Sequence, residues 1–590
     1  MSRLNPPRAA TFALSLFAIL TLLSFPFSRT GRATSEPADL ILHNGFIWTV
    51  DSKNSTAQAV AIRDGRFIAV GSNRDVLKLR GPRTEIIDLA GRFALPGFND
   101  NHVHFQSAAQ FLEFNIMAVS TQEEFIRRVK EVIASLPNGE WIVGGFWGAY
   151  DQWAAGSAGG GVRAAFNPDM RLVEEITRNH PAFIRKFDDS EFAANSSALR
   201  AAGIDPENPS APDVEFVKDG NGRFTGRMRG RGTLRAFSNV LPRRFSHERR
   251  LEQTKNALAE IRRHGVTNVS DMSDDEQLEI YRELLKSGEL TTRVHFRPGL
   301  DRWKEMSERG IKVGSGDEWI RVGALKGHID GIMGNSTARF YEPYSNDTNN
   351  RGRWRPLMVD DKGNFVEGKF LKYMLDADRA GLQLTVHAIG DEANGLLLDY
   401  LEELDRQNGK RDRRFRLVHA QVLALKDFKR LGRLGIVAEV QPFHLSDDMR
   451  WMEERIGRER CKTAYAFKSI QQSGAILCFG TDWPGTSASE YPINPMLGLY
   501  AAVTRQTLSG QPAAGWFPEQ RISIEDAIRA YTYNTAYANF EEKIKGSVEA
   551  GKFADIVVLS KNLLRVAPKE FLSTEALYTI VGGRVVYRKP

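Results

Sequence analysis

Residues 382–406 read LQLTVHAIGDEANGLLLDYLEELDR, and residues 414–421 read RFRLVHAQ. The two apolar runs reach His387 and His419, and the stretch between them has the apolar spacing of an amphipathic helix. Short, continuous apolar runs are typical of parallel strands that are buried on both faces. This segment therefore predicts one strand–helix–strand unit of a parallel sheet.

The same alternation extends through the middle of the chain. Eight candidate strands cover residues 92–98, 266–270, 293–296, 320–326, 383–387, 415–419, 436–440 and 475–479. Eight strands with helices between them predict an α/β protein with a TIM-type (β/α)8 barrel, which we assign to residues 93–540. The first two strands are too far apart for one crossover, so residues ~120–240 are expected to form an insertion. Its glycine-rich stretch GSAGGG (residues 156–161) predicts a mobile loop and lacks the features of a phosphate loop.

Both ends of the chain have the pattern of short strands and turns. Residues 40–50 (LILHNGFIWTV) and 554–560 (ADIVVLS) are strand-like, and Asp64-Gly65 and Gly582-Gly583 are turn signals. We expect residues 38–92 and 541–590 to form one small β-sandwich. Residues 1–33 have a basic start, a short apolar centre and a small-residue cleavage site, which predict a signal peptide and export, with an uncleaved membrane anchor as the alternative.

Composition narrows the classes of partner and ligand. The net charge of +7 is dispersed, without a dense Lys/Arg block or a nucleic-acid motif, so no nucleic-acid partner is expected. The two cysteines, Cys461 and Cys478, form no C-x-x-C pair, which argues against disulfides and thiolate metal sites. Any metal must therefore bind histidines, carboxylates or a modified side chain.

Polar residues stand where several of the predicted strands end. His102 and His104 follow the first strand, two residues apart, so both imidazoles can face one ion. His387 and His419 are 32 residues apart, about one βα repeat. Asp482 follows 63 residues after His419. Since functional side chains lie at the carboxyl ends of barrel strands, we expect these residues to converge.

Lys326 ends another predicted strand, 61 residues before His387. A buried lysine has a lowered pKa and hence a free amine that can react. No comparable signal indicates a functional role for the remaining histidines. We interpret these as ordinary, without a role in the site: His43, His180, His247, His264, His295 and His328.

Several motifs resemble the amidohydrolase superfamily, specifically family 3, the group of N-substituted formamide deformylase-like enzymes. The matching stretches run from about residue 40 to the C-terminus: PGFNDNHVHF, KGHIDGIMGNSTA, HAIGDEAN, VHAQ, EVQPFH, GTDWPG, YTYNTAYA and GSVEAGKFADIVVLS. The resemblance implies metal ligation by four histidines and Asp482, with Asp482 also accepting the proton of the nucleophilic water. The implied histidine ligands are His102, His104, His387 and His419.

The resemblance also implies a metal role for Lys326. Its position matches a lysine that many superfamily members carboxylate so that it bridges two metals; the alternative is an unmodified lysine with one metal. Zinc is the expected ion, although iron, manganese or nickel suit the same ligands. His444, in QPFH, is a catalytic candidate that binds the substrate carbonyl or else has a structural role.

The chain departs from the family in the insertion. Family members commonly carry Asp-Gly-His-x-x-Trp-x-Asn-Ser, whereas residues 188–196 read DDSEFAANS, with Ser190 and Ala193 in place of the histidine and tryptophan. If these positions shape the pocket, it is wider and differently polar, so relatives' substrates do not transfer.

The resulting prediction is a hydrolase that cleaves a non-peptide C–N bond of a small amide-type substrate with metal-activated water. The alternatives are hydrolysis of esters, lactones or phosphoesters at the same metal centre, and an exported binding protein without turnover. For the oligomeric state of the protein, we consider a homodimer.

Overall fold

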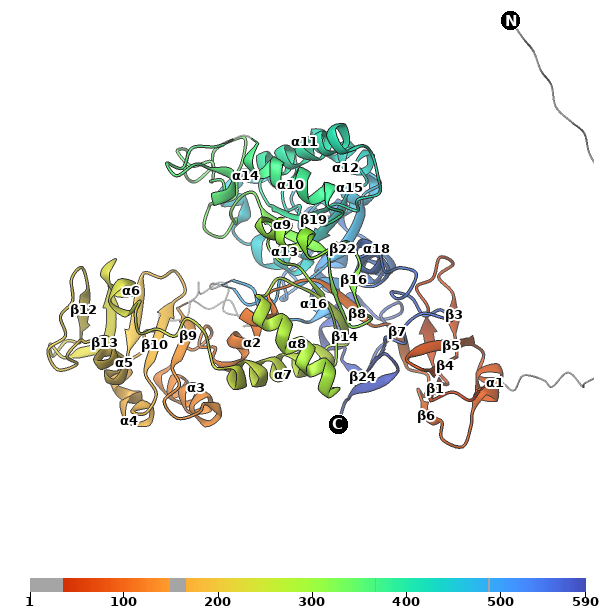
Figure 1. Cartoon of the computed structure of the whole chain (residues 1–590), viewed down its shortest axis with the longest axis horizontal. Helices are drawn as coiled ribbons and strands as arrows, with labels where there is room; N and C mark the ends of the chain where they lie inside the picture. Colours follow the sequence, from red (N-terminus) through yellow and green to blue (C-terminus); the bar gives the residue numbers. More distant parts are fainter. Residues whose placement is uncertain (1–35, 149–165, 367, 487–488) are drawn as a thin grey trace, which may run out of the picture.

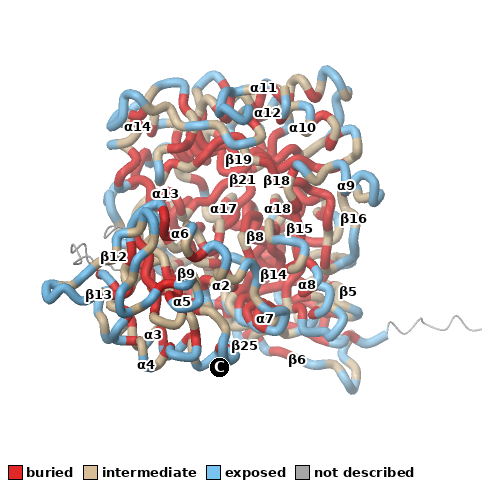
Figure 2. Tube along the Cα trace, turned by 60° about the vertical axis from the view of Figure 1, so that its left-hand side comes forward, coloured by how far each residue is buried: buried red, intermediate tan, exposed pale blue. Residues whose placement is uncertain are grey.

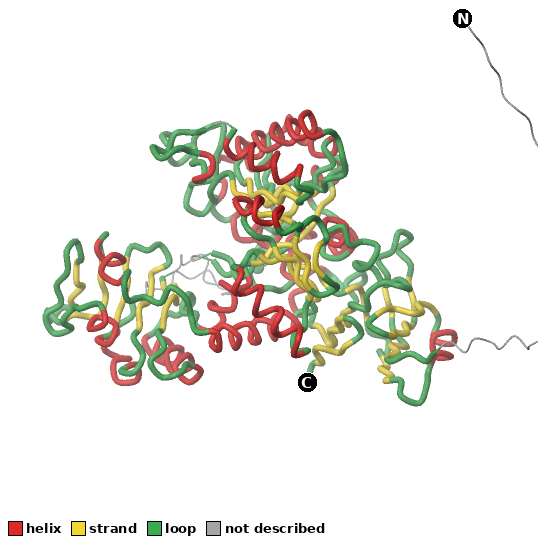
Figure 3. Tube along the Cα trace, viewed as in Figure 1, coloured by secondary structure: helices red, strands yellow, loops and turns green. Residues whose placement is uncertain are grey.

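The computed structural model describes residues 36–148, 166–366, 368–486 and 489–590 (Figure 1). Helices and strands alternate through most of this range, so the chain is a mixed α/β protein (Figure 3). The predicted signal segment at 1–33 and the glycine-rich stretch at 156–161 lie outside the described residues. Among the helices that are described, none has the length and apolar character needed to cross a membrane.

Two five-stranded sheets make up the centre of the molecule. The first has the order β16 (Ser315–Gly316), β17 (Ile320–Val322), β15 (Arg293–Phe296), β14 (Val266–Asp271), β8 (Phe98–Val103). The second has the order β18 (Ala324–His328), β19 (Gln383–Ala388), β20 (Arg416–His419), β21 (Val437–Val440), β22 (Ile476–Phe479). All pairs except β16–β17 are parallel.

Parallel bridges connect the two sheets at both sides. Gly299, after β15, pairs with Lys326 in β18, and Val103 in β8 pairs with Trp483, which follows β22. Gly480 allows the second contact, because a Cβ added there would lie 2.6 Å from the backbone nitrogen of His102. The carboxyl ends of the strands of both sheets therefore face a common region.

The predicted first strand at 92–98 is wrong as one element. Residues Phe93–Pro96 form β7 in a sheet made by the chain ends, and the parallel strand β8 begins at Phe98. Pro96 has no N–H for a ladder, and Gly97 packs so closely that a Cβ would lie 2.2 Å from Thr267. His102 consequently lies inside β8 rather than after it, and the sheet of the chain ends continues past residue 92.

The predicted strand at 320–326 is also two strands. β17 ends at Val322 and β18 begins at Ala324, each in a different sheet. Between them Gly323 has φ 129°, and a Cβ there would lie 2.2 Å from the carbonyl oxygen of Lys312. Only glycine fits this break. Lys326 is thus in the middle of β18 rather than at its end.

Helices connect the central strands and cover their outer sides. Figure 2 shows buried chain around β18, β19 and β21 and exposed turns along α10–α12. Local signals explain the bounds of α8, whose N-terminus is capped by the Asp274 side chain and whose C-terminus is the left-handed Gly288. The connecting helices are α2 (Phe105–Glu113), α7 (His247–Arg263), α8 (Asp275–Ser287), α9 (Trp303–Glu308), α10 (Lys369–Arg379), α11 (Asp391–Asn408), α12 (Phe428–Arg433), α13 (Pro442–Asp448), α14 (Met452–Cys461), α15 (Phe467–Gln472), α16 (Pro495–Thr504), α17 (Ile524–Ala530) and α18 (Tyr533–Ala538).

The two ends of the chain meet in one six-stranded sheet. Its order is β25 (Arg584–Arg588), β24 (Ala576–Val581), β23 (Ile556–Leu559), β7 (Phe93–Pro96), β2 (Phe46–Trp48), β3 (Thr56–Ala57). A four-stranded sheet adjoins it, with the order β5 (Arg66–Gly71), β4 (Ala59–Arg63), β1 (Leu40–His43), β6 (Glu85–Asp88), near α1 (Asn73–Val76). One hydrophobic cluster includes residues of both sheets, among them Leu42, Val60, Ala94, Val558 and Ile580.

Helices and strands between residues 122 and 237 form a lobe at the left of Figure 1. Its sheet has the order β12 (Glu215–Lys218), β13 (Phe224–Arg229), β11 (Glu191–Ala194), β10 (Ala182–Lys186), β9 (Ile142–Trp147). The helices described beside it are α3 (Gln122–Ser135), α4 (Glu174–Thr177), α5 (Ser196–Ala201) and α6 (Gly232–Phe237). The lobe has two hydrophobic clusters of its own.

Candidate metal centre

The seven side chains that the sequence singled out line one cavity of about 530 Å³. They come from β8, β18, β19 and β20, from α13, and from the segments that follow β8 and β22. Parallel strands place their carboxyl ends at one edge, which is why residues far apart in the chain meet there. The seven are His102, His104, Lys326, His387, His419, His444 and Asp482.

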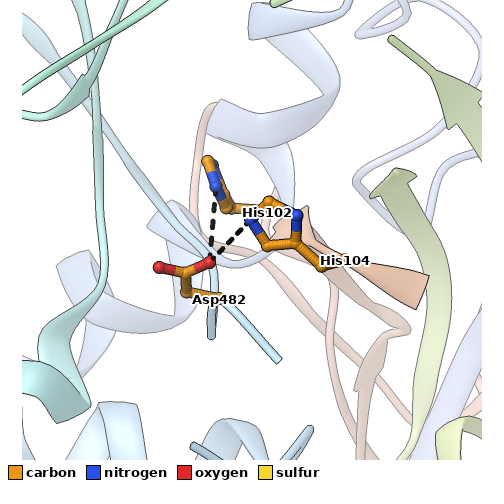
Figure 4. Close-up of side chains that lie close together, drawn as sticks. All are labelled: His102, His104 and Asp482. Atoms are coloured by element: carbon orange, nitrogen blue, oxygen red, sulfur yellow. Dashed lines mark ion pairs between the residues drawn. The ribbon is translucent and has the colours of Figure 1, made fainter. Parts of the chain in front are cut away.

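His102, His104 and Asp482 form the tightest group (Figure 4). Oδ1 of Asp482 lies 3.5 Å from Nε2 of His102 and 3.3 Å from Nε2 of His104. One ligand atom from each residue lies within 4.8 Å of the others, a spacing that suits coordination of one divalent ion. Burial alone would raise the pKa of Asp482, but the neighbouring imidazoles outweigh it and hold that pKa well below its usual value.

A buried carboxylate orients His102. Nδ1 of His102 lies 2.6 Å from Oε1 of Glu439, which leaves Nε2 directed at Asp482. Glu439 also pairs with Arg297 at 3.0 Å and Arg416 at 3.1 Å, and these side chains are fully buried. Burial would raise the pKa of Glu439, but the two guanidinium groups hold it below its usual range. A carboxylate on the outer nitrogen is the usual support for a metal-ligating histidine.

His387 and His419 form a second pair on neighbouring strands. Their ring centroids are 4.5 Å apart. Nε2 of His387 is 3.0 Å from the carbonyl oxygen of Gly331, and Nδ1 of His419 is 2.7 Å from Oε1 of Gln441. Each ring therefore has one nitrogen engaged by the protein and one left for a ligand. Burial lowers the pKa of His419 well below its usual value, which keeps the ring neutral, as metal ligation requires.

Lys326 lies between these groups. Its Nζ is 3.5 Å from Nε2 of His102, and the side chain is buried. Burial lowers the pKa of Lys326 to about 7, against opposing effects of Glu439 and Asp482. Burial, with the nearby Lys326, lowers the pKa of His102 to about 3. A lysine that can lose its proton is compatible with a metal centre, whereas a fixed ammonium would repel the ion.

His444 stands at the edge of the group. Its ring stacks on Tyr491 with centroids 3.9 Å apart, and its Nε2 is 3.3 Å from the carbonyl oxygen of Thr481. The same atom is 3.9 Å from Oδ2 of Asp482. Burial lowers the pKa of His444, so the ring is neutral. The geometry is compatible both with contact to a substrate and with support of the Thr481–Asp482 backbone.

His328, which we interpreted as ordinary from the sequence, lies beside one of the candidate ligands. It lines the same cavity, and its ring centroid is 5.4 Å from that of His387. The sequence held a signal for it, because His328 is two residues after Lys326 on one strand and therefore faces the same side. Glu439 was missed as well, although a single carboxylate in the apolar run IVAEV needs a buried partner.

The insertion reaches the cavity through a short loop after β10. Phe187, Asp188 and Asp189 line it. The two divergent positions lie elsewhere: Ser190 donates its hydroxyl to Asp188 at 2.6 Å, and Ala193 is buried in the core of the lobe. Neither is among the described lining residues of the cavity.

The ligand set fits a divalent metal. Two imidazoles and one carboxylate converge, and the outer nitrogen of His102 is already bound by Glu439. Such a donor set suits zinc, iron, manganese or nickel rather than calcium or magnesium.

A family model described as the amidohydrolase family matches residues 85–587. The chain belongs to the amidohydrolase family. The resemblance inferred from its motifs is thereby confirmed.

Three curated relatives match nearly the whole length of this family member. Protein LONG AFTER FAR-RED 3 of Arabidopsis thaliana is 34% identical, over 98% of this chain and 97% of the relative. The putative amidohydrolase YtcJ of Bacillus subtilis is 29% identical over 93% and 99%. N-substituted formamide deformylase of Arthrobacter pascens is 26% identical over 93% and 98%.

A solved structure has the same fold. An uncharacterized metal-dependent hydrolase from Pyrococcus horikoshii superposes with a TM-score of 0.69 at 25% identity, covering 90% of this chain and 99% of that one. Family membership and the His/His/Asp group together support metal-dependent hydrolysis of small molecules by this amidohydrolase family member.

Proposed function

We propose that this protein hydrolyses a non-peptide C–N bond, of the amide type, in a small molecule. The observation that carries the proposal is Asp482 held between the Nε2 atoms of His102 and His104 at 3.5 and 3.3 Å, inside a cavity that also holds His387 and His419. This pairs a carboxylate able to move a proton with ligands for a metal. The relative named as an N-substituted formamide deformylase supports the choice of bond.

The architecture we propose is a (β/α)8 barrel over residues 93–540, with an insertion at ~120–240 and a β-sandwich from residues 38–92 and 541–590. The parallel bridges Gly299–Lys326 and Val103–Trp483 support closure of the two central sheets into one barrel. The cluster shared by the two sheets of the chain ends supports the sandwich. In this fold, chemistry belongs at the carboxyl ends of the strands, where most of the candidate residues lie, with Lys326 further back in β18.

A divalent metal, zinc by the preference of the ligands, would supply a water of lowered pKa and polarise the substrate carbonyl. His102, His104 and Asp482 would hold one ion, and His387, His419 and Lys326 a second. Asp482 accepts the proton of the attacking water and delivers it to the departing nitrogen. His444, 3.9 Å from Oδ2 of Asp482, is the candidate to contact the substrate carbonyl.

Lys326 is proposed to be carboxylated on Nζ. Four imidazole ligands and one carboxylate would leave two divalent ions short of negative charge, and a carbamate would provide that charge and two oxygens. The lowered pKa of the buried Lys326 supports a reactive free amine. The alternative is an unmodified lysine with one metal.

We also propose that residues 1–33 direct export of the protein, with retention of this segment as a membrane anchor as the alternative. The assembly to test is a homodimer.

The test combines metal analysis with matched substrates. The full chain is stripped with a chelator, reloaded with zinc, manganese, iron(II) or nickel, and assayed on N-acyl amines, esters, lactones and phosphoesters that share acyl or leaving groups. We expect the chelator to abolish turnover, the metal to restore it, and amide-type compounds to react best. Turnover of esters, lactones or phosphoesters alone would favour the rival chemistry, and full metal content without turnover would indicate a binding protein.

A further inference from the structure

Two cavities meet beside the candidate metal centre. The second has a volume of about 1100 Å³ and is lined by segments after β14, β15 and β18. It shares four lining residues with the metal-site cavity: His104, Lys326, His328 and Arg355. These four residues therefore lie at the boundary between the metal-site cavity and the larger one.

Arg355 is held firmly at this junction. Its backbone N–H donates to the carbonyl of Ile329 at 2.9 Å, and its Nε donates to the carbonyl of Asp330 at 3.0 Å. Asp330 in turn lies 3.3 Å from Nε2 of His387. The loop that carries Arg355 is thus fixed to the chain directly after β18. The side-chain bond uses Nε, and within the described residues both terminal nitrogens of the guanidinium remain for another partner.

The charged side chains that line the metal-site cavity differ in whether they have a partner within the protein. In the metal-site cavity two carboxylates outside the metal group have cationic partners, since Asp188 lies 3.9 Å from Lys186 and Asp189 accepts from Arg185 at 2.8 Å. The third, Asp448, accepts a hydrogen bond from the hydroxyl of Tyr465 at 2.6 Å. Within the described part of the chain Arg355 has no ion pair, and it is exposed to the cavity. The guanidinium is therefore a cation that the protein itself leaves uncompensated at this place.

We propose that Arg355 determines substrate specificity by binding a carboxylate of the substrate, so that the substrate is an amide-type compound with an acidic group close to the scissile bond. The inference rests on the proposed function and adds its substrate class. A guanidinium with two free terminal nitrogens binds a carboxylate in bidentate fashion, which provides both affinity and orientation. Because Arg355 is tethered beside Asp330 and His387, a carboxylate bound there is positioned relative to the metal ligands.

The second cavity offers a contrasting residue. Asp301 lines it, is exposed, and has no ion pair among the described residues. Asp301 would bind the cationic group of a positively charged substrate instead. Substrate pairs of opposite charge therefore distinguish the two possibilities.

The experiment measures charge preference in the metal-loaded full chain. N-formyl and N-acetyl derivatives of glycine, β-alanine and 4-aminobutyric acid are compared with their neutral carboxamides and with the matching N-acyl diamines. For the wild type we expect kcat/KM for the carboxylates to exceed that for the carboxamides by at least about tenfold, since a hydrogen bond to a charged group contributes that much or more. Arg355→Met should bring the ratio close to one, mainly through KM, and Arg355→Lys should keep part of it.

Matched variants serve as controls. Arg353→Met removes an exposed arginine of the same loop that lines neither cavity, and it should keep the wild-type ratio. Asp301→Asn should leave the carboxylate preference intact. Circular dichroism and metal content check that each variant is folded and loaded.

The outcomes separate this inference from the proposed function. Hydrolysis of neutral amides as fast as of carboxylates, or an unchanged ratio in a folded Arg355→Met, overturns the role of Arg355 while C–N hydrolysis stands. A preference for the cationic compounds that Asp301→Asn removes also overturns it. If the loaded enzyme hydrolyses none of the amides, the proposed function fails, and the inference fails with it.

Discussion

The backbone N–H of Asp482 donates to the carbonyl of His102 at 2.8 Å, while its carboxylate oxygen lies 3.5 Å from Nε2 of the same histidine. Two residues that are far apart in the chain are thus held together by main chain and side chain at once. Asp482 has φ 62°, a left-handed conformation that is unfavourable for a non-glycine residue. Strain of this kind is found where the surrounding structure holds a functional side chain in a fixed direction, as it does for the carboxylate of Asp482.

Replacing Asp482 with asparagine should remove proton transfer while keeping the shape of the side chain. We expect kcat to fall by about 10²–10⁴-fold, the usual contribution of a general acid–base group, with a further loss where metal binding weakens. Steady-state kinetics at saturating metal measure the effect. Asp361→Asn, which alters an exposed aspartate, is the control. Wild-type kcat in Asp482→Asn would exclude this role.

Glu439→Gln should weaken metal binding, although Glu439 is not itself a proposed metal ligand. The variant leaves Arg297 and Arg416 without their shared carboxylate and weakens the support on Nδ1 of His102. We expect metal affinity to fall about 10- to 100-fold and stability to fall by about 3–5 kcal/mol. Metal titration by calorimetry and the thermal midpoint check the two effects, with the exposed Glu525→Gln as control. Unchanged metal affinity would contradict the orienting role.

Lys326→Ala tests the bridging carbamate. If Lys326 bridges two ions, the variant should lose at least one metal per chain and nearly all turnover, because the cluster loses negative charge and two ligand oxygens. Short carboxylic acids at high concentration should restore part of the activity. Metal analysis and carbon-13 NMR of protein grown with labelled carbon dioxide give the readout, and Lys362→Ala alters an exposed lysine for comparison. Full metal content with normal turnover, or wild-type protein with one metal and no carbamate signal, would exclude bridging.

Asp448 should make stability depend on pH. Burial raises the pKa of this carboxyl to about 7, despite hydrogen bonds from Tyr465 and Gln421. The folded protein therefore holds a proton that the unfolded chain, in which an aspartate has its ordinary pKa of 3.8, releases, so stability is lost as the pH rises from about 4 to 7. The loss is on the order of a few kcal/mol. Thermal midpoints of metal-free protein across this range should fall less steeply in Asp448→Asn than in the wild type or in Asp361→Asn. Parallel slopes would show that Asp448 is ionised when folded.

Much of the fold could be predicted from local sequence patterns, because apolar residues recur with different periods in strands and in helices. The runs that reach His387 and His419 predicted neighbouring parallel strands, and β19 and β20 are paired in parallel. The distances of one and two repeats predicted that their polar ends would meet Asp482. What the pattern did not reveal was the division of residues 92–98 and 320–326, because Gly97 and Gly323 break those strands only through close contacts with distant backbone and side chains.

By itself the sequence determined the family, the order of the elements and the identity of the candidate ligands, because these depend on residue type and spacing along one chain. Tertiary structure alone decided which outer partners hold the site together. Glu439 on His102, Arg297 and Arg416 on Glu439, and Arg355 at the junction of two cavities arise where separate strands and loops meet. Such contacts join residues at unrelated spacings, and the burial that makes them strong exists only once the chain has folded.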